Sequence, residues 1–143
     1  MIIKQLSIFV ENKKGRLAEI TQTLADSGVD IRALSIADTT DYGILRLIVN
    51  DPDTALKALK NEGMTVSLTD VIAVAVPDTP GGLNKAVKVL SAEKISIEYM
   101  YAFINPRKDT AFVILCVEDN ERAIDVLTRG GVKLMKNEEI YSL

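Results

Sequence analysis

The 143-residue sequence contains one pattern written twice. When Gly15 is aligned with Gly81, the segment NKKGRLAEITQTLADSGVDI coincides with DTPGGLNKAVKVLSAEKISI, and apolar residues meet apolar residues along both segments. The aligned ranges are residues 12–31 with 78–97 and, after two extra residues in the second copy, residues 44–63 with 112–131. Because this repeat covers nearly the whole chain, the fold is expected to be one structural unit built twice.

Each copy predicts the order strand, helix, strand, strand, helix, strand. In the first copy, residues 4–10 alternate between apolar and polar, as in a half-buried strand, and Leu17 and Leu24 follow at helical spacing. Residues 31–37 and 42–50 then predict a hairpin around the polar turn DTTD. This order favours an α+β fold in which each unit is ferredoxin-like (βαββαβ), with a four-stranded antiparallel sheet and both helices on one face.

The second copy repeats this order. Its predicted elements are the strand VIAVAV, a helix over residues 80–93, a hairpin of ISIEYMYAFI and AFVILCV around NPRKD, a helix over 120–129, and the strand VKLM. Almost no linker separates MTVSL of the first copy from VIAVAV of the second. We therefore expect two closely coupled domains, residues 1–69 and 70–143, paired side by side.

The segment DPD at residues 51–53 predicts the start of a helix. Asp51 is a preferred capping residue, and Pro52 suits the first helical position. Asp53 faces the positive end of the helix dipole.

Composition excludes several kinds of site. Histidine is absent and Cys116 is the single cysteine, so an intrachain disulfide, a Cys/His zinc cluster and a histidine general base are ruled out. Cys116 lies in an apolar run and is expected to be a buried residue of a strand. The net charge of −3 arises from 17 Lys plus Arg and 20 Asp plus Glu that are interspersed along the chain, a pattern that argues against a nucleic-acid-binding surface.

The apolar runs are short. AFVILCV, at residues 111–117, is far shorter than the roughly 20 residues of a membrane-spanning helix. Polar residues interrupt the first twelve positions, unlike the continuous apolar stretch of a secretory signal. These features predict a cytoplasmic protein that binds neither membranes nor nucleic acid, and they imply no metal or cofactor.

The βαββαβ layout serves RNA binders, acylphosphatases, metallochaperones and small-molecule sensors, so the site must decide among them. An RNA-recognition domain needs stacking aromatics on its first and third strands. Here Tyr99, Tyr101 and Phe103 fall on the second strand of the second copy, and we interpret them as core or interface residues. A metallochaperone would need a Cys-rich loop, which is lacking. An acylphosphatase needs an arginine and an asparagine at an anion-binding loop, a role for which Arg16 and Asn12 are in the right neighbourhood.

Residues 12–31 and 78–97 both resemble the signature of ACT domains: an Asp or Asn, two residues that often include proline, a glycine, a leucine, a helix, and a turn into a strand that opens with a polar residue and isoleucine. The resemblance covers both repeats, so the chain looks like a free-standing tandem ACT protein. ACT domains are regulatory modules that bind amino acids, usually at an interface between two domains placed side by side. The resemblance implies a non-catalytic, allosteric, amino-acid-binding protein that forms a homodimer and acts on a regulated enzyme or another protein partner.

In ACT domains the ligand lies against the loop between the first strand and first helix, and it reaches the start of the second strand of the neighbouring domain. The matching positions in this sequence are Asn12, Lys14, Gly15, Arg16, Leu17 and Asp30 in the first copy, and Asp78, Thr79, Pro80, Gly81, Gly82, Leu83 and Ser96 in the second. Free N–H groups at a helix start attract a carboxylate, and Asp30, Asp78 or Asn12 can receive an ammonium group. The glycine permits close approach of the ligand to the main chain.

Structural roles stand beside these ligand roles. Asn12 and Asp78 are preferred helix caps, and Pro80 fits a first helical turn. The loop KKGR is basic where TPGG is neutral, so either one loop or both loops could bind. Three hypotheses follow: an amino-acid sensor, a small acylphosphatase-like enzyme using Arg16 and Asn12, and an interaction module without a ligand.

Overall fold

The computed structural model describes residues 1–38, 41–104 and 108–143, and these form two compact units. We call Lys4–Thr69 together with Tyr141–Leu143 the N-terminal unit, and Met1–Ile3 together with Asp70–Ile140 the C-terminal unit. The three residues at each end of the chain thus group with the repeat to which they do not belong in sequence.

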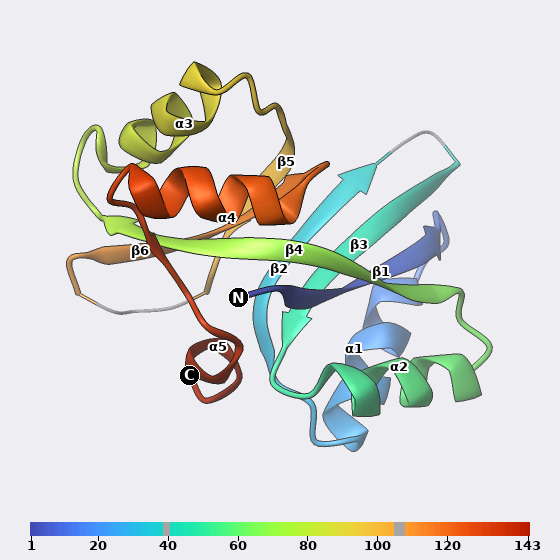
Figure 1. Cartoon of the computed structure of the whole chain (residues 1–143). Coiled ribbons are helices and arrows are strands. Elements are labelled where there is room, and N and C mark those ends of the chain that lie inside the picture. Colours follow the sequence, from blue (N-terminus) through green and yellow to red (C-terminus); the bar gives the residue numbers. More distant parts are fainter. Residues whose placement is uncertain (39–40, 105–107) are drawn as a thin grey trace. The chain divides into compact units, whose positions relative to one another are not determined.

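The N-terminal unit has the predicted order of elements (Figure 1). Its strands lie in the order β2-β3-β1-β4, and both β1 and β2 pair with β3 in antiparallel fashion. The elements are β1 (Ile3–Glu11), α1 (Arg16–Asp26), β2 (Ile31–Asp38), β3 (Tyr42–Val49), α2 (Pro52–Asn61) and the first part of β4 (Val66–Pro77).

The C-terminal unit repeats this arrangement. Here β4 pairs with β6 and β7, and β5 pairs with β6, all antiparallel. The elements are the second part of β4, α3 (Gly82–Ala92), β5 (Ile97–Ala102), β6 (Thr110–Val117), α4 (Asn120–Arg129), β7 (Lys133–Leu134) and α5 (Asn137–Tyr141). The predicted α+β class and the repeated ferredoxin-like unit are therefore confirmed.

Each unit has its own core between its sheet and its helix pair. In the N-terminal unit, Leu6 and Ile8 of β1 pack with Leu24 of α1 and Leu59 of α2. In the C-terminal unit the core residues include Val74 of β4, Leu90 of α3 and Leu127 of α4. Two pairs that the repeat aligns, Leu24 with Leu90 and Leu59 with Leu127, thus occupy matching places in the two cores, and all four residues are at most 1% exposed.

Three predicted details differ from the structure. MTVSL and VIAVAV were expected as separate strands, but residues 66–77 form the single strand β4, because neither glycine nor proline interrupts them. VKLM forms only the two-residue strand β7. The helix α5, at residues 137–141, was not predicted. The predicted turns DTTD and NPRKD include residues 39–40 and 105–107, which lie outside the described residues.

The capping prediction for α2 is confirmed. The Asp51 carboxylate accepts a hydrogen bond from the Thr54 N–H (3.1 Å) and another from its hydroxyl (2.6 Å), and Pro52 is the first helical residue. At the matching place in the second copy, Asp119 accepts from the Arg122 N–H and caps α4. Both repeats therefore begin their second helix in the same way.

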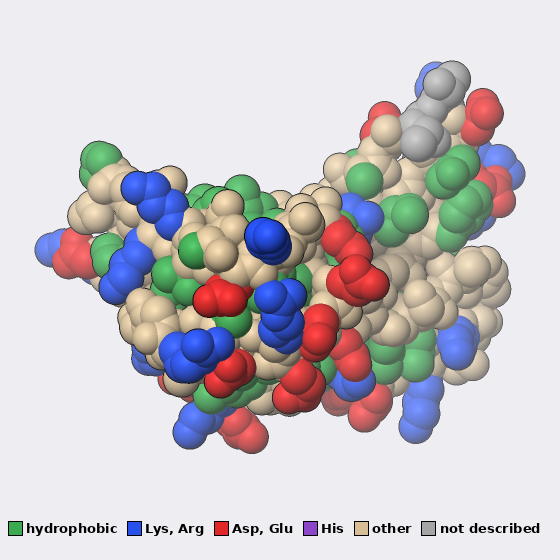
Figure 2. Space-filling view, turned by 45° about the horizontal axis from the view of Figure 1, so that its top comes forward, with side chains coloured by type: hydrophobic (Ala, Val, Ile, Leu, Met, Phe, Trp, Pro, Cys, Tyr) green, Lys and Arg blue, Asp and Glu red, His purple; other side chains and the backbone are tan. Residues whose placement is uncertain are grey.

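The remaining sequence predictions concern single residues and surface charge. Cys116 is buried in β6, as predicted. Tyr99 and Tyr101 are partly buried on β5, and Phe103 packs edge-to-face on Phe112 with ring centroids 5.9 Å apart. Lysine and arginine side chains are intermingled with aspartate and glutamate on the face shown in Figure 2, in agreement with the interspersed charges of the sequence.

Candidate ligand-binding site

A cavity of about 260 Å³ lies in the N-terminal unit where β1 leads into α1. We call it the loop cavity. It falls just below the roughly 300–1,000 Å³ range of pockets for drug-sized molecules, so it suits a small ligand. Its lining residues are Val10, Glu11, Asn12, Lys13, Arg16, Leu17, Ile36, Asp38 and Gly43.

Residues near the end of the sheet line one side of the loop cavity. Gly43 lies opposite both Val10 of β1 and Asp38 of β2, so these three residues face the same side. A side chain at position 43 would be crowded, because its Cβ would lie 3.2 Å from the Ala37 carbonyl oxygen. Glycine at this position therefore keeps this side of the loop cavity open.

The loop conformation explains how α1 begins. Gly15 is the cap residue, with φ of 81°, and it has no side chain to cover the first-turn N–H groups. The prediction that Asn12 caps the helix is wrong, since Gly15 takes that place three residues later. The Asn12 N–H instead donates to the Asp41 carbonyl oxygen (3.2 Å), which ties the loop to the β2–β3 hairpin.

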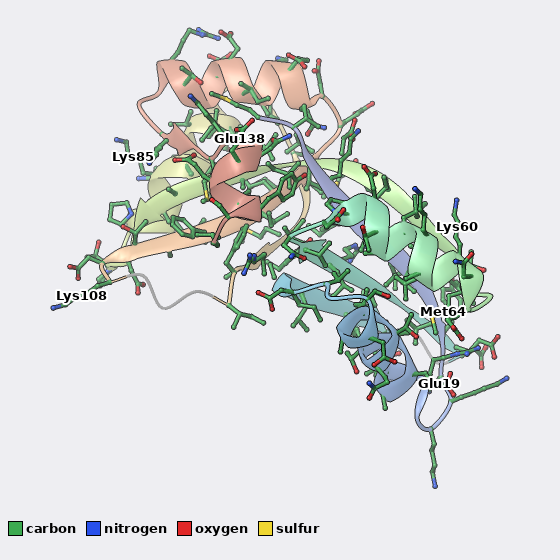
Figure 3. All side chains as sticks on the ribbon, turned by 90° about the horizontal axis from the view of Figure 1, so that it is seen from below. Glu19, Lys60, Met64, Lys85, Lys108 and Glu138 are labelled. Atoms are coloured by element: carbon green, nitrogen blue, oxygen red, sulfur yellow. The ribbon has the colours of Figure 1, made fainter. Side chains whose placement is uncertain are left out.

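Ion pairs already engage the basic residues of this loop. Lys13 Nζ lies 2.7 Å from Glu11 Oε2, and the Arg16 guanidinium lies 3.1 Å from Glu19 and 3.8 Å from Glu11. Glu19 projects from the first turn of α1 (Figure 3). The hydrogen bond from Lys13 holds the pKa of Glu11 below its ordinary value. The loop cavity is therefore lined by both negative side chains, Glu11 and Asp38, and positive side chains, Lys13 and Arg16.

The predicted loop residues of the first copy divide into two sets. Asn12, Arg16 and Leu17 line the loop cavity, and Lys14 and Gly15 do not. Of the other lining residues, the sequence pointed only to Lys13, as a basic residue of the KKGR loop that could help to hold a carboxylate. The signal that could have pointed to Asp38 is its place just before the predicted turn of the β2–β3 hairpin. Because β3 runs antiparallel to both β1 and β2, the end of β2 lies at the same edge of the sheet as the end of β1. The lining residues that the sequence did not point to are Val10, Glu11, Ile36, Asp38 and Gly43.

The second loop differs from the first at the residue that follows the capping glycine. Gly82 occupies the place of Arg16, and the Pro77 carbonyl oxygen fills the space that a Cβ at residue 82 would need. Leu83 packs against the core of the C-terminal unit, whereas Leu17 is 45% exposed.

The remaining predicted residues of the second loop lie at the surface. Asp78, Thr79, Pro80 and Gly81 are exposed. Gly81 is the cap of α3, with φ of 86°. The predictions that Asp78 caps the helix and that Pro80 lies in its first turn are therefore wrong. The Asp78 N–H donates instead to the Asp109 carbonyl oxygen (3.0 Å).

Asp30 and Ser96 open the second strands of their units, away from the loops. Asp30 pairs with Arg32 at 2.5 Å, and its N–H donates to Asn50 Oδ1 at 2.8 Å. The 11-residue helix α1 separates Asp30 from Gly15 by about 16 Å along its axis, so one unit does not bring them together. Ser96 lines two surface hollows of about 160 and 450 Å³, together with Lys94 and Ile95.

The described residues offer no group of three or more acidic, cysteine or histidine side chains that could hold a metal ion. Over the same residues, no helix combines the length and the apolar character needed to cross a membrane.

Residues 1–143 match the family model of the ACT domain pair. Among solved structures, protein BT0572 from Bacteroides thetaiotaomicron has 45% sequence identity and a TM-score of 0.94, over 100% of this chain and 98% of that one. The ligand-free regulatory subunit of aspartate kinase from Thermus thermophilus shares the fold, with 18% identity and a TM-score of 0.62 over 89% of this chain and 91% of the other. The regulatory subunit of aspartate kinase from Thermus flavus has 17% identity and a TM-score of 0.59, over 90% and 94% of the two chains. No curated protein matches the sequence. Since the family model spans every residue, the chain belongs to the ACT domain pair family.

Proposed function

We propose that this chain is a non-catalytic regulatory protein that binds a free amino acid in the loop cavity. Membership of the ACT domain pair family supports a regulatory, ligand-binding role. The observation that carries the choice of ligand is the presence of Arg16 and Asp38 on one small cavity. An amino acid bears a carboxylate and an ammonium group on the same carbon, so a cavity with one cation and one anion complements both.

The two charged groups of the ligand have separate partners in this proposal. Arg16 and the uncapped first-turn N–H groups of α1 receive the carboxylate. Asp38 and the side-chain oxygen of Asn12 accept hydrogen bonds from the ammonium group. Arg16 also contacts Glu19, but a guanidinium has five N–H donors and can serve both carboxylates.

Only the first loop is proposed to bind. The Pro77 carbonyl oxygen takes the space in the second loop where the side chain of Arg16 begins in the first. The second loop therefore has neither the cation nor the room, and we expect one ligand per chain rather than two.

Binding would act on a partner through linkage. A ligand shifts the balance between two arrangements of a protein by the difference in its affinity for them. The solved regulatory subunits of aspartate kinase suggest the kind of partner, a separate enzyme. That the ligand also touches a neighbouring ACT domain, and that the chain forms a homodimer, stay predictions.

Asn12 and Arg16 lie on the same cavity, as an acylphosphatase requires. Glu11 and Asp38 line it as well, and their negative charges oppose an acyl phosphate. An assay with acetyl phosphate tests this alternative: hydrolysis that is lost in Arg16→Ala would favour an enzyme over a sensor.

A thermal-shift screen with each common amino acid tests the main proposal. A ligand present at 100 times its dissociation constant adds about 2.7 kcal/mol to the free energy of unfolding. We expect a shift with one or a few amino acids, a stoichiometry of one per chain by calorimetry, and a loss of at least tenfold in affinity in Arg16→Ala and Asp38→Asn. Lys14→Ala is the matched control, since it removes a neighbouring charge that does not line the cavity. If no amino acid shifts the transition, the proposal is wrong.

A further inference from the structure

This inference rests on the proposed function and concerns the side chain of the amino acid. The loop cavity has a charged rim, made of Glu11, Lys13, Arg16 and Asp38, and an apolar wall. The apolar wall consists of Val10 from β1, Leu17 from α1 and Ile36 from β2. Leu17 and Ile36 are 45% and 44% exposed. An apolar group that enters the cavity removes this surface from water, which favours binding.

The wall and the rim are spaced to fit one small molecule. Ile36 and Asp38 are two residues apart on β2, so their side chains share a face and stand about 7 Å apart along the strand. Ile36 lies opposite Leu45, two residues further from the end of the sheet than the pair of Asp38 and Gly43. An amino acid whose ammonium group is held by Asp38 can therefore direct its side chain toward Ile36 and Leu17.

The charges around the loop cavity do not favour a second charge on the ligand. Glu11 is paired with Lys13 at 2.7 Å, and Arg16 is paired with Glu19 at 3.1 Å. A charged ligand side chain would have to compete with these pairs, in addition to the α-carboxylate and α-ammonium groups. We infer that the loop cavity selects amino acids with an apolar side chain.

A homologous ligand series tests this inference on the full chain. Calorimetry with alanine, 2-aminobutyrate, norvaline and leucine should show affinity rising about fourfold for each added methylene, until the cavity is filled. Serine, aspartate and lysine serve as polar comparisons and should bind at least tenfold more weakly than leucine. Phenylalanine tests whether the apolar side chain is aromatic, and affinity above that of leucine would support an aromatic member of the same apolar class.

Substitutions in the apolar wall test whether Ile36 and Leu17 contact the side chain of the ligand. Ile36→Ser and Leu17→Ser should flatten the rise along the series, so that leucine gains less over alanine than it does in the wild type. Leu34→Ser is the matched control, because Leu34 is 45% exposed on the same face of β2 but does not line the cavity. Analytical ultracentrifugation of each variant shows whether the change alters the oligomeric state.

The outcomes separate this inference from the proposed function. Tighter binding of serine, aspartate or lysine than of leucine overturns the inference and leaves the proposed function intact. Equal flattening in Leu34→Ser and Ile36→Ser also overturns it, since the effect would then belong to the exposed strand rather than the cavity. If no amino acid binds, both the inference and the proposed function fail.

Discussion

The carbonyl oxygen of Pro77 lies 1.9 Å from the position that a Cβ atom on Gly82 would occupy. At the matching place in the first copy, Arg16 carries a full side chain, so the two loops are built differently despite the shared glycine before each helix. The difference bears on the question that the repeat raised, whether one loop or both bind a ligand. In the second loop the main chain at Pro77 lies against the start of α3, so there is no room for a side chain like that of Arg16, which lines the loop cavity.

Gly82→Ala is expected to destabilise the protein by roughly 1–3 kcal/mol, because the new methyl group would overlap the Pro77 carbonyl and force the backbone to move. Urea unfolding followed by circular dichroism measures the change. Arg16→Ala at the matching position should alter the free energy of unfolding by less than about 0.5 kcal/mol, as is usual for surface sites outside the core. Similar effects of the two changes would show that the loops are equivalent after all.

Lys94→Gly is expected to stabilise the protein by about 0.5–1 kcal/mol. Lys94 has φ of 57°, a left-handed conformation that costs a residue with a Cβ about 1–2 kcal/mol, part of which is offset by the greater backbone entropy of glycine in the unfolded chain. Gly28 holds the matching position in the first copy, with φ of 71° and open space where a Cβ atom would lie. Gly28→Lys should therefore lower stability by a similar amount, as measured by thermal unfolding of both variants. A loss of stability in Lys94→Gly, or a gain in Gly28→Lys, would contradict the assignment of strain to this conformation.

The sequence predicted those parts of the fold that depend on local pattern. The period of Leu17 and Leu24 placed α1, and the DPD segment placed the start of α2, because propensity and capping act over a few residues. The two-residue strand β7 and the helix α5 depend on packing that is not local, and their segments have no strong period. The length of β4 was missed because a domain boundary was expected to interrupt a strand.

The candidate site was predicted only along one segment of the chain. Asn12, Arg16 and Leu17 belong to the segment around Gly15 that carries the ACT signature, and all three line the loop cavity. Asp38 and Ile36 come from a strand about 20 residues later, and their approach to the loop depends on the pairing of β2 with β3 and of β3 with β1. A motif cannot specify that pairing. The capping error has a simple cause too, since a glycine in a left-handed conformation starts each first helix in place of a polar side chain.

Asp51→Ala is expected to cost about 1 kcal/mol at neutral pH, because it removes the acceptor for the Thr54 N–H at the start of α2. Asp51→Asn should cost less, since asparagine caps nearly as well. The hydrogen bond from the Thr54 hydroxyl, with a further one from its N–H, holds the pKa of Asp51 below its ordinary value. A carboxyl group with a lowered pKa contributes stability above its unfolded pKa and loses that contribution as the pH falls. The advantage of the wild type over Asp51→Asn should therefore shrink when urea unfolding is repeated at pH values that fall from the unfolded pKa of the carboxyl group through its lowered folded pKa. An advantage that stays constant with pH would contradict this role.

Glu11→Gln is expected to tighten amino-acid binding by roughly two- to fivefold, the range of exposed ion pairs. Glu11 lies beside Lys13 and Arg16 on the loop cavity, where its negative charge repels the carboxylate of the ligand and competes with it for Arg16. The hydrogen bond from Lys13 lowers the pKa of Glu11, so the group is ionised at neutral pH and the substitution removes a full charge.

Because exposed charges are screened by ions, the gain in affinity from Glu11→Gln should be larger at low than at high ionic strength. Calorimetry at two salt concentrations measures it, with Glu62→Gln as a control that makes the same charge change at the end of α2. Weaker binding in Glu11→Gln would instead mean that Glu11 holds Lys13 and Arg16 in the geometry that the ligand needs.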